Sequence, residues 1–167
     1  MKKILETERL YVRELTLNDE AELSKVLSDA ESMKYYPHPF SPQEVENWIK
    51  WNIDNYAKYG FGLWAVIRKE DAAFLGDCGI TMQNIDGEQL PEAGFHIIKD
   101  FQRKGYASEA ARAVIEYASK KYHFPKIYSY CEVHNEPSRG VMIKAGMVKE
   151  KEYSKESITR VVYSKAF

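Results

Sequence analysis

The sequence has few cysteines, little net charge and no long hydrophobic run, and each shortage excludes a class of protein. Cys78 and Cys131 are the only cysteines among 167 residues, too few and too far apart for a disulfide framework or a metal cluster. The four histidines also lack the spacing of metal ligands. We therefore expect no metal site, and a reducing, cytoplasmic location.

The charge balance and the hydropathy argue against two kinds of partner. With a formal net charge of -1, nothing indicates binding to nucleic acid or to a membrane surface. No apolar run approaches the roughly 20 residues of a transmembrane helix, and the first residues lack the apolar core of a signal peptide. The length predicts a single domain over residues 1–167. Twelve tyrosines and three tryptophans suggest a cleft lined with aromatic rings.

Hydrophobic periodicity predicts a mixed α/β fold with about seven strands and about four helices. Helices are expected to begin near residue 19, after Ser41, after Gly105 and near residue 135. Ser41 and Glu44 have the spacing of a capping box, with Pro42 at the first helical position. Strands are expected at 9–13, 63–67, 74–82, 93–98, 127–133, 147–154 and 158–166, with a turn over 84–91.

The segment from 93 to 133 reads as one strand–helix–strand unit of about 40 residues, which predicts two parallel strands with a right-handed crossover. Its turn, within residues 97–110, passes from an apolar strand through basic residues to the start of a helix. Backbone N–H groups and the positive end of a helix dipole would meet there and form a binding site for a phosphate group. Gly105 would let the backbone approach the anion, and Arg103 and Lys104 would add positive charge.

Four motifs occur in the order of one known family. Residues 102–107 fit the pattern Q/R-x-x-G-x-G/A, and residues 7–13 fit T-E-R-L-x-x-R. Residues 135–147 follow N-x-x-S-x-x-x-x-x-K-x-G-F except for Met147, and residues 74–80 read F-L-G-D-C-G-I. With these motifs the sequence resembles the GNAT superfamily of acetyl-CoA-dependent N-acetyltransferases. The resemblance is greatest to the branch typified by ribosomal-protein N-terminal acetyltransferases.

The resemblance implies how acetyl-CoA would bind. The pantetheine arm would enter a splay between two parallel central strands, where it would pair with Ile97 and Ile98 and hydrogen-bond to Asn135. The pyrophosphate would bind at the turn formed by Gln102, Arg103, Lys104, Gly105, Tyr106, Ala107 and Ser108. A main-chain N–H in the splay would polarise the thioester carbonyl.

The resemblance also implies direct attack by an amine in a ternary complex. Many members of the superfamily have a tyrosine, the acid for the departing thiolate, where this chain has Met142. Ser138 is the best candidate to replace it, and the alternative is that Ser138 only caps a helix. Glu92 or Glu132 would act as the base, with Glu92 favoured, unless both are solvated strand residues.

The acceptor would be a primary amine on a peptide or a small molecule, and the likeness leaves a homodimer open. Tyr35 and Tyr36 would form a wall of the acceptor site and hold an ammonium group by cation–π contact, or would only pack the loop. His96, like the other histidines, is expected to be a surface or partly buried residue. The alternatives to an enzyme are a CoA-binding sensor of the same fold and a binding protein for another nucleotide.

Overall fold

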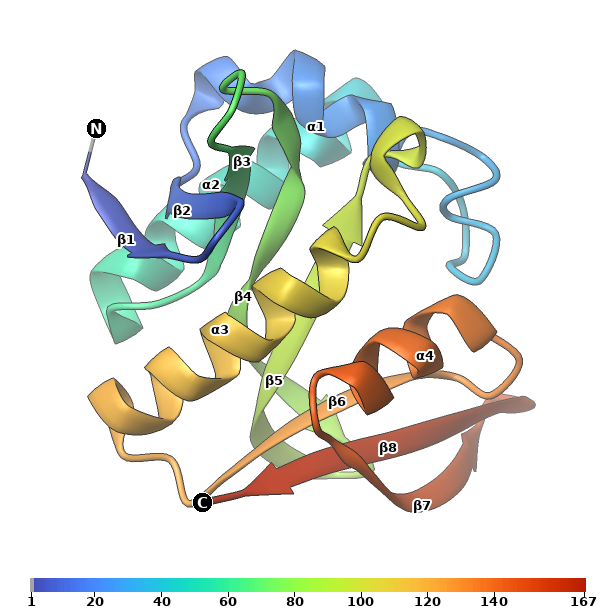
Figure 1. Cartoon of the computed structure of the whole chain (residues 1–167). Helices are drawn as coiled ribbons and strands as arrows, with labels where there is room; N and C mark the ends of the chain where they lie inside the picture. Colours follow the sequence, from blue (N-terminus) through green and yellow to red (C-terminus); the bar gives the residue numbers. More distant parts are fainter. Residues whose placement is uncertain (1) are drawn as a thin grey trace.

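An eight-stranded mixed sheet forms the centre of the molecule (Figure 1) in a computed structural model that describes residues 2–167. The strands, in the spatial order β1-β2-β3-β4-β5-β6-β8-β7, are β1 (Lys3–Glu6), β2 (Leu10–Glu14), β3 (Leu63–Arg68), β4 (Phe74–Ile85), β5 (Glu88–Ile97), β6 (Lys126–Glu132), β7 (Val148–Lys155) and β8 (Ile158–Ala166). The predicted mixed α/β fold is confirmed. The sequence predicts about seven strands, and the additional one is β1, an edge strand of four residues.

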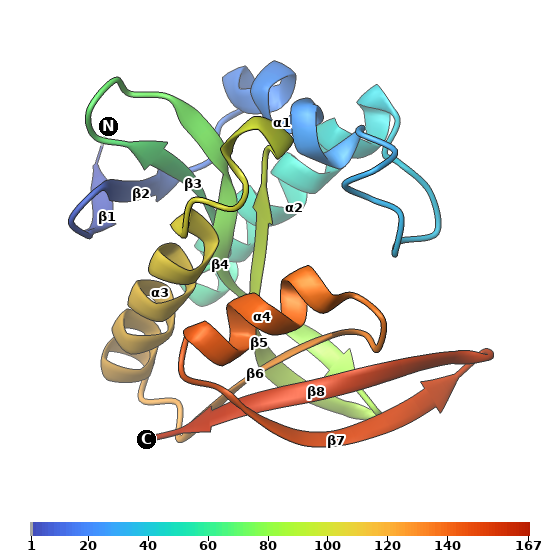
Figure 2. The same cartoon turned by 45° about the vertical axis from the view of Figure 1, so that its right-hand side comes forward.

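Helices cover both faces of this sheet (Figures 1 and 2). They are α1 (Glu20–Leu27), α2 (Pro42–Tyr59), α3 (Tyr106–Tyr122) and α4 (Glu136–Lys144), with short 3-10 turns at Leu17–Asp19 and Lys99–Phe101. One core lies under α1 and α2, where Leu23 and Ile49 meet Ala65 of β3. The other lies under α3 and α4, where Val114 meets Val66 and Leu75. None of the helices within residues 2–167 is long and apolar enough to cross a membrane.

The start of α2 follows from local chemistry. Ser41 Oγ accepts a hydrogen bond from the Glu44 N–H at 3.2 Å, and the Glu44 carboxylate accepts one from the Ser41 N–H at 2.9 Å. Pro42 occupies the first helical position. The predicted capping box is therefore confirmed.

The β4–β5 hairpin is longer than the sequence predicts. A turn is expected over 84–91, but β4 continues to Ile85 and β5 begins at Glu88. Asp86 and Gly87 alone make the turn, with φ of 49° and 89°. Two left-handed residues match the twist of the flanking strands, so the pairing extends to the turn itself.

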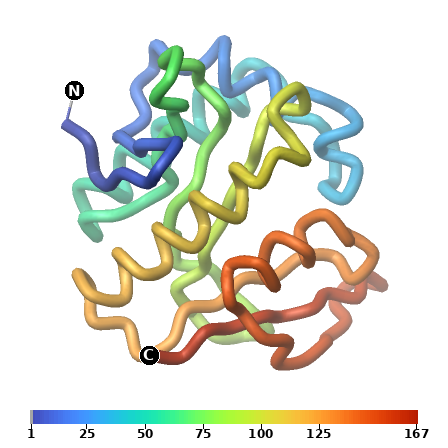
Figure 3. Tube along the Cα trace, in the orientation of Figure 1, coloured from blue at the N-terminus to red at the C-terminus, as the bar shows by residue number. Residues whose placement is uncertain are grey.

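The parallel pair of strands diverges, as expected. Strands β5 and β6 pair in parallel at Glu92 and Tyr128, which is their one register pair within residues 2–167. Beyond this pair they separate toward their carboxyl ends (Figure 3). The divergence places the end of β5, the start of α3 and the start of α4 around one space.

Candidate active site

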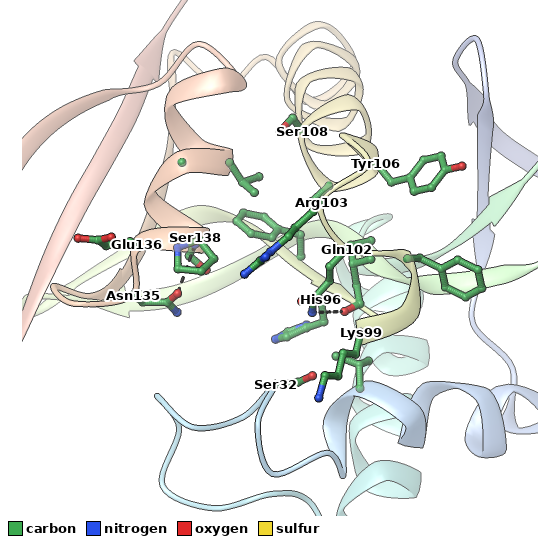
Figure 4. Close-up of a pocket in the computed structure, with 18 of the residues that line it drawn as sticks. Ser32, His96, Lys99, Gln102, Arg103, Tyr106, Ser108, Asn135, Glu136 and Ser138 are labelled. Atoms are coloured by element: carbon green, nitrogen blue, oxygen red, sulfur yellow. Dashed lines mark hydrogen bonds between the residues drawn. The ribbon is translucent and has the colours of Figure 1, made fainter.

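A cavity of about 590 Å³ lies where β5 and β6 diverge (Figure 4). Three segments form its walls: the end of β5 with the turn into α3, the start of α4, and residues 31–36 between α1 and α2. The predicted site residues among its walls are Ile97, Gln102, Arg103, Gly105, Tyr106, Ala107, Ser108, Asn135 and Ser138. The cavity therefore brings together motifs that are about 30 residues apart in the sequence.

The turn before α3 has the geometry of an anion site. Gly105, the N-cap of α3, has a φ of 81°, and Arg103 has a φ of 62°. Within residues 2–167 no side chain caps this helix start, so the first N–H groups of α3 keep their hydrogen-bonding capacity. The Arg103 side chain extends across the cavity (Figure 4). An anion at this turn would meet backbone N–H groups, the helix dipole and a guanidinium group.

The T-E-R segment, residues 7–9, holds this turn in place through hydrogen bonds on the side away from the cavity. The Glu109 carboxylate accepts hydrogen bonds from the Thr7 hydroxyl at 2.5 Å, from the Arg9 N–H at 3.0 Å and from Arg9 Nε at 2.7 Å. Arg9 then donates to the Lys104 carbonyl at 3.0 Å. Burial alone would raise the pKa of Glu109, but these hydrogen bonds lower it below its ordinary value. Lys104 thus belongs to the back of the turn and is not part of the cavity wall.

The Tyr106 ring also supports the turn. It points away from the cavity (Figure 4) and is 7% exposed. The Arg9 guanidinium lies 4.3 Å from the ring centroid, and Arg68 donates to the Tyr106 hydroxyl at 3.2 Å. Tyr106 therefore contributes its backbone to the cavity and its side chain to packing.

Several main-chain groups at the end of β5 already have hydrogen-bond partners within the protein. The Ile98 N–H donates to the Leu75 carbonyl and the Ile98 carbonyl accepts from the Phe101 N–H, both at 2.8 Å. The Ile97 carbonyl accepts from Gln102 Nε2 at 2.9 Å. The expected pairing of Ile98 with a pantetheine arm is therefore at odds with the structure, because both of its main-chain groups already have partners. Ile97 is the residue of the two that faces the cavity.

At the start of α4, the two expected polar residues have different roles. Asn135 is the N-cap, and its Oδ1 accepts from the Ser138 N–H at 3.2 Å (Figure 4). The Ser138 side chain does not cap the helix, and its hydroxyl has no hydrogen-bond partner among residues 2–167. Met142 is 1% exposed and belongs to the core. A hydroxyl group is thus available at the cavity wall, while the side chain of Met142 is not.

The two candidate carboxylates differ in environment. Glu92 lies where β5 meets β6, and its carboxylate accepts from the Ser129 hydroxyl at 3.3 Å. Burial raises the pKa of Glu92 to about 8, although hydrogen bonds from the Tyr130 N–H and Ser129 act in the opposite direction. Glu132 ends β6 and accepts from the His134 N–H at 3.3 Å. Neither carboxylate is part of the cavity wall, and the raised pKa of Glu92 suits a base that works near neutral pH.

A buried polar network beside Glu92 is not expected from the sequence. His96 Nδ1 lies 2.7 Å from Asp77 Oδ1, and Trp48 Nε1 donates to Asp77 Oδ2 at 3.1 Å. The Tyr36 hydroxyl lies 3.1 Å from His96 Nε2. His96 and Tyr36 line the cavity, whereas Asp77 is wholly buried. The sequence contains one indication of this network. Glu92, Gly94 and His96 are alternate residues of a strand, so they lie on one face of β5.

Comparison with known proteins assigns the family. Residues 9–148 match the profile described as acetyltransferase (GNAT) domain. The chain belongs to the GNAT family. It is 34% identical over 146 residues to the uncharacterized N-acetyltransferase YnaD of Bacillus subtilis, covering 86% of this chain and 82% of YnaD. The crystal structure of a GNAT-family acetyltransferase from Bacillus anthracis has a TM-score of 0.82 at 27% identity, covering 97% of each chain.

GNAT membership establishes acyl transfer from acetyl-CoA as the family reaction. The structure of RimL, a ribosomal L7/L12 α-N-protein acetyltransferase in complex with coenzyme A, has a TM-score of 0.76 to this chain. The identity is 15%, over 99% of this chain and 98% of RimL, so this similarity concerns the fold alone. Within residues 2–167 of this GNAT protein, no group of three or more His, Cys, Asp or Glu side chains could hold a metal ion.

The contacts around Glu109 lead to a first prediction. Glu109→Ala removes three hydrogen bonds that fix the T-E-R segment to the turn, so the KM for acetyl-CoA should rise about tenfold. We expect kcat to change by less than threefold, because Glu109 is outside the cavity. Steady-state kinetics with varied acetyl-CoA measures this. The control is Glu116→Ala, an exposed glutamate further along α3 whose partner is Lys120. A fall in kcat as large as the rise in KM would contradict a positioning role.

Proposed function

We propose that this GNAT protein is an N-acetyltransferase that moves the acetyl group of acetyl-CoA to a primary amine. The observation that carries the proposal is a partly buried carboxylate with a raised pKa, Glu92, at the divergence of β5 and β6. A cavity with an anion-binding turn adjoins that point. An amine must be neutral to attack a thioester, and a base with a pKa near 8 suits this task.

The residues around the cavity fit acetyl-CoA as a substrate. Arg103 and the first N–H groups of α3 would hold the pyrophosphate, with Gly105 allowing close approach. The free Nδ2 of Asn135 and the main chain of Ile97 would hydrogen-bond to the pantetheine arm. Gln102 already fixes the Ile97 carbonyl and so shapes this edge of the cavity.

In the proposed reaction Glu92 takes a proton from the attacking nitrogen. The nitrogen adds to the thioester carbonyl and the C–S bond breaks. The Ser138 hydroxyl passes a proton to the departing thiolate and takes one back from solvent, and Glu92 releases its proton to solvent. A covalent acyl-enzyme is disfavoured by the state of the cysteines. Burial raises the pKa of Cys131 to about 12, and Cys78 is fully buried in the core. Direct attack in a ternary complex therefore fits the site better.

A thiol-release assay tests the proposal. Purified protein would be mixed with acetyl-CoA and a panel of alkylamines, aminoglycosides, polyamines and peptides with free α-amines. The peptides should include N-terminal sequences of ribosomal proteins, because the T-E-R-L and N-x-x-S motifs resemble that branch. We expect amine-dependent release of CoA thiol and an acetamide product by mass spectrometry. Binding of acetyl-CoA without turnover of any amine would instead favour a CoA-binding sensor.

The free hydroxyl of Ser138 leads to a second prediction. Ser138→Ala removes the donor to the thiolate while Asn135 still caps α4 through its own side chain. We expect kcat to fall about 100-fold, the lower end of the range for a lost acid catalyst, and the Kd for acetyl-CoA to change by less than threefold. Turnover and calorimetric binding measure the two quantities. Ser119→Ala, on the exposed face of α3, is the matched control. Parallel losses in both quantities would remove Ser138 from the acid role.

A further inference from the structure

The network of Tyr36, His96, Asp77 and Trp48 is a connected path from the cavity into the protein. The Tyr36 hydroxyl is at the cavity, and the residue as a whole is 42% exposed. The His96 side chain is 11% exposed and that of Asp77 is 0% exposed. The structure thus places one hydroxyl, one imidazole and one carboxylate in series, with Trp48 fixing the second oxygen of the carboxylate.

This arrangement determines which atoms of His96 can exchange a proton. Asp77 Oδ1 accepts the proton on His96 Nδ1, so Nε2 faces the Tyr36 hydroxyl. Burial alone would lower the pKa of His96, but the carboxylates of Asp77 and Glu92 raise it above its ordinary value. Of the other charged groups at this wall, Glu31 and Lys99 pair with each other at 3.3 Å, and Lys34 lies over the Tyr35 ring. Nε2 is therefore the atom through which His96 can exchange a proton with Tyr36.

The proposed reaction removes two protons from the amine. A primary amine in neutral water is an ammonium ion, with a pKa near 8 for an α-amine and about 10.4 for a lysine-type amine. It loses one proton before it attacks and another as the amide forms, and the thiolate takes up one proton as it leaves. Glu92 takes the second proton of the amine, so the first must pass to solvent or to another group on the acceptor side of the cavity.

We propose that the Tyr36 hydroxyl contacts the incoming ammonium group and relays its first proton to His96, leaving the second proton to Glu92. This inference rests on the proposed function. One N–H bond of the ammonium breaks and its proton passes to Tyr36 Oη, while the Tyr36 proton moves to His96 Nε2. Tyr36 is restored, and the imidazolium of His96 faces the Asp77 carboxylate. After the acetyl transfer, His96 releases its proton to solvent through the cavity.

The strand geometry places the two proposed acceptors on one face of β5. Glu92, Gly94 and His96 lie on one face of β5, so Glu92 and His96 are at the two ends of this row. Gly94 has no side chain between them. A Cβ built at Gly94 would lie 3.5 Å from Glu92 Oε1 and 3.3 Å from Leu63 Cδ2. The Glu92 carboxylate therefore lies over Gly94, displaced along the strand toward His96.

The test uses Tyr36→Phe, which removes only the hydroxyl of a half-exposed ring. The acceptor would be a peptide with a free α-amine, assayed from pH 6 to pH 10. Near pH 7.5 most of the α-amine is charged, and we expect the kcat/KM of Tyr36→Phe to be about 100-fold below that of the wild type. Above pH 9 the amine is already neutral, and the loss should shrink to less than threefold. His96→Gln should reproduce this pattern. Tyr59→Phe, at the end of α2 and outside the cavity, should match the wild type.

The outcomes separate this inference from the proposed function. A loss that is equal at all pH values would mean that Tyr36 only shapes the site, and would overturn the relay. An active wild type with an equally active Tyr36→Phe variant would also overturn the relay, and would leave the proposed function intact. No turnover of any amine by the wild type would overturn the proposed function, and the relay with it.

Discussion

Glu92→Gln is expected to lower kcat about 1,000-fold while the Kd for acetyl-CoA changes by less than twofold. Glutamine has nearly the same shape and can still accept a hydrogen bond from Ser129, but it cannot take a proton from an amine. Glu92 is also outside the wall of the cavity that would hold the cosubstrate. Turnover by thiol release and affinity by calorimetry measure the two effects.

If Glu92 is the base, the activity should also depend on pH in a defined direction. Burial places the pKa of Glu92 at about 8, so below pH 8 the group is increasingly protonated and unable to act as a base. For an acceptor that is neutral over the whole range, kcat/KM should rise about tenfold per pH unit below pH 8 and level off above it. The Glu92→Gln variant should lack this rise. The control is Glu132→Gln, and if that variant lost the activity instead, the base would be Glu132.

The stability of the variant provides an independent check. The folded state favours the protonated form of Glu92, because its pKa is raised from 4.5 to about 8. The stability that this group contributes is fully present below pH 4.5 and is lost as the pH rises through 8. Glu92→Gln should therefore raise the Tm by several degrees at pH 9 and leave it nearly unchanged at pH 4. A lower Tm at pH 9 would show that the carboxylate is charged and well solvated in the fold.

The features of the fold that the sequence predicts correctly depend on local chemistry. The capping box at Ser41 and the turn before α3 are set by residues within a few positions of each other. The parallel pair of β5 and β6 follows from the order of strand, helix and strand, because a crossover helix leaves few other arrangements. These features could be read without knowledge of the tertiary contacts.

The parts that the sequence does not predict depend on contacts between distant segments. Nothing near His96 in the chain shows that Asp77, 19 positions earlier, accepts its Nδ1 proton, or that Tyr36, 60 positions earlier, meets Nε2. The occupation of Ile98 by Leu75 and Phe101 depends likewise on strand register. The T-E-R segment is an intermediate case. Its likeness to a family motif was visible, but its contact with Glu109 needs the fold.

Gly105→Val should raise the Kd for acetyl-CoA at least 100-fold while the protein stays folded. Gly105 begins α3 with a φ of 81°, a conformation that a β-branched residue adopts only with strain. A Cβ there would also lie 3.3 Å from an Arg9 nitrogen, so Arg9 would have to move slightly, and the strained φ would favour a shift of the turn. A shifted turn would point its N–H groups away from the pyrophosphate, and the added side chain would obstruct its approach.

The backbone strain itself needs a control, and the chain provides one. Gly87, in the β4–β5 turn, has a φ of 89° and no atom within 4 Å of a built Cβ. Gly87→Val should therefore lose a similar amount of stability through strain and keep full affinity for acetyl-CoA. Calorimetric titration with acetyl-CoA and thermal unfolding of both variants make the comparison. If Gly105→Val binds acetyl-CoA as tightly as Gly87→Val does, the turn before α3 is not the pyrophosphate site. If only Gly105→Val loses binding, the loss arises from the position of Gly105 and not from backbone strain in general. That result is expected if the start of α3 binds the pyrophosphate.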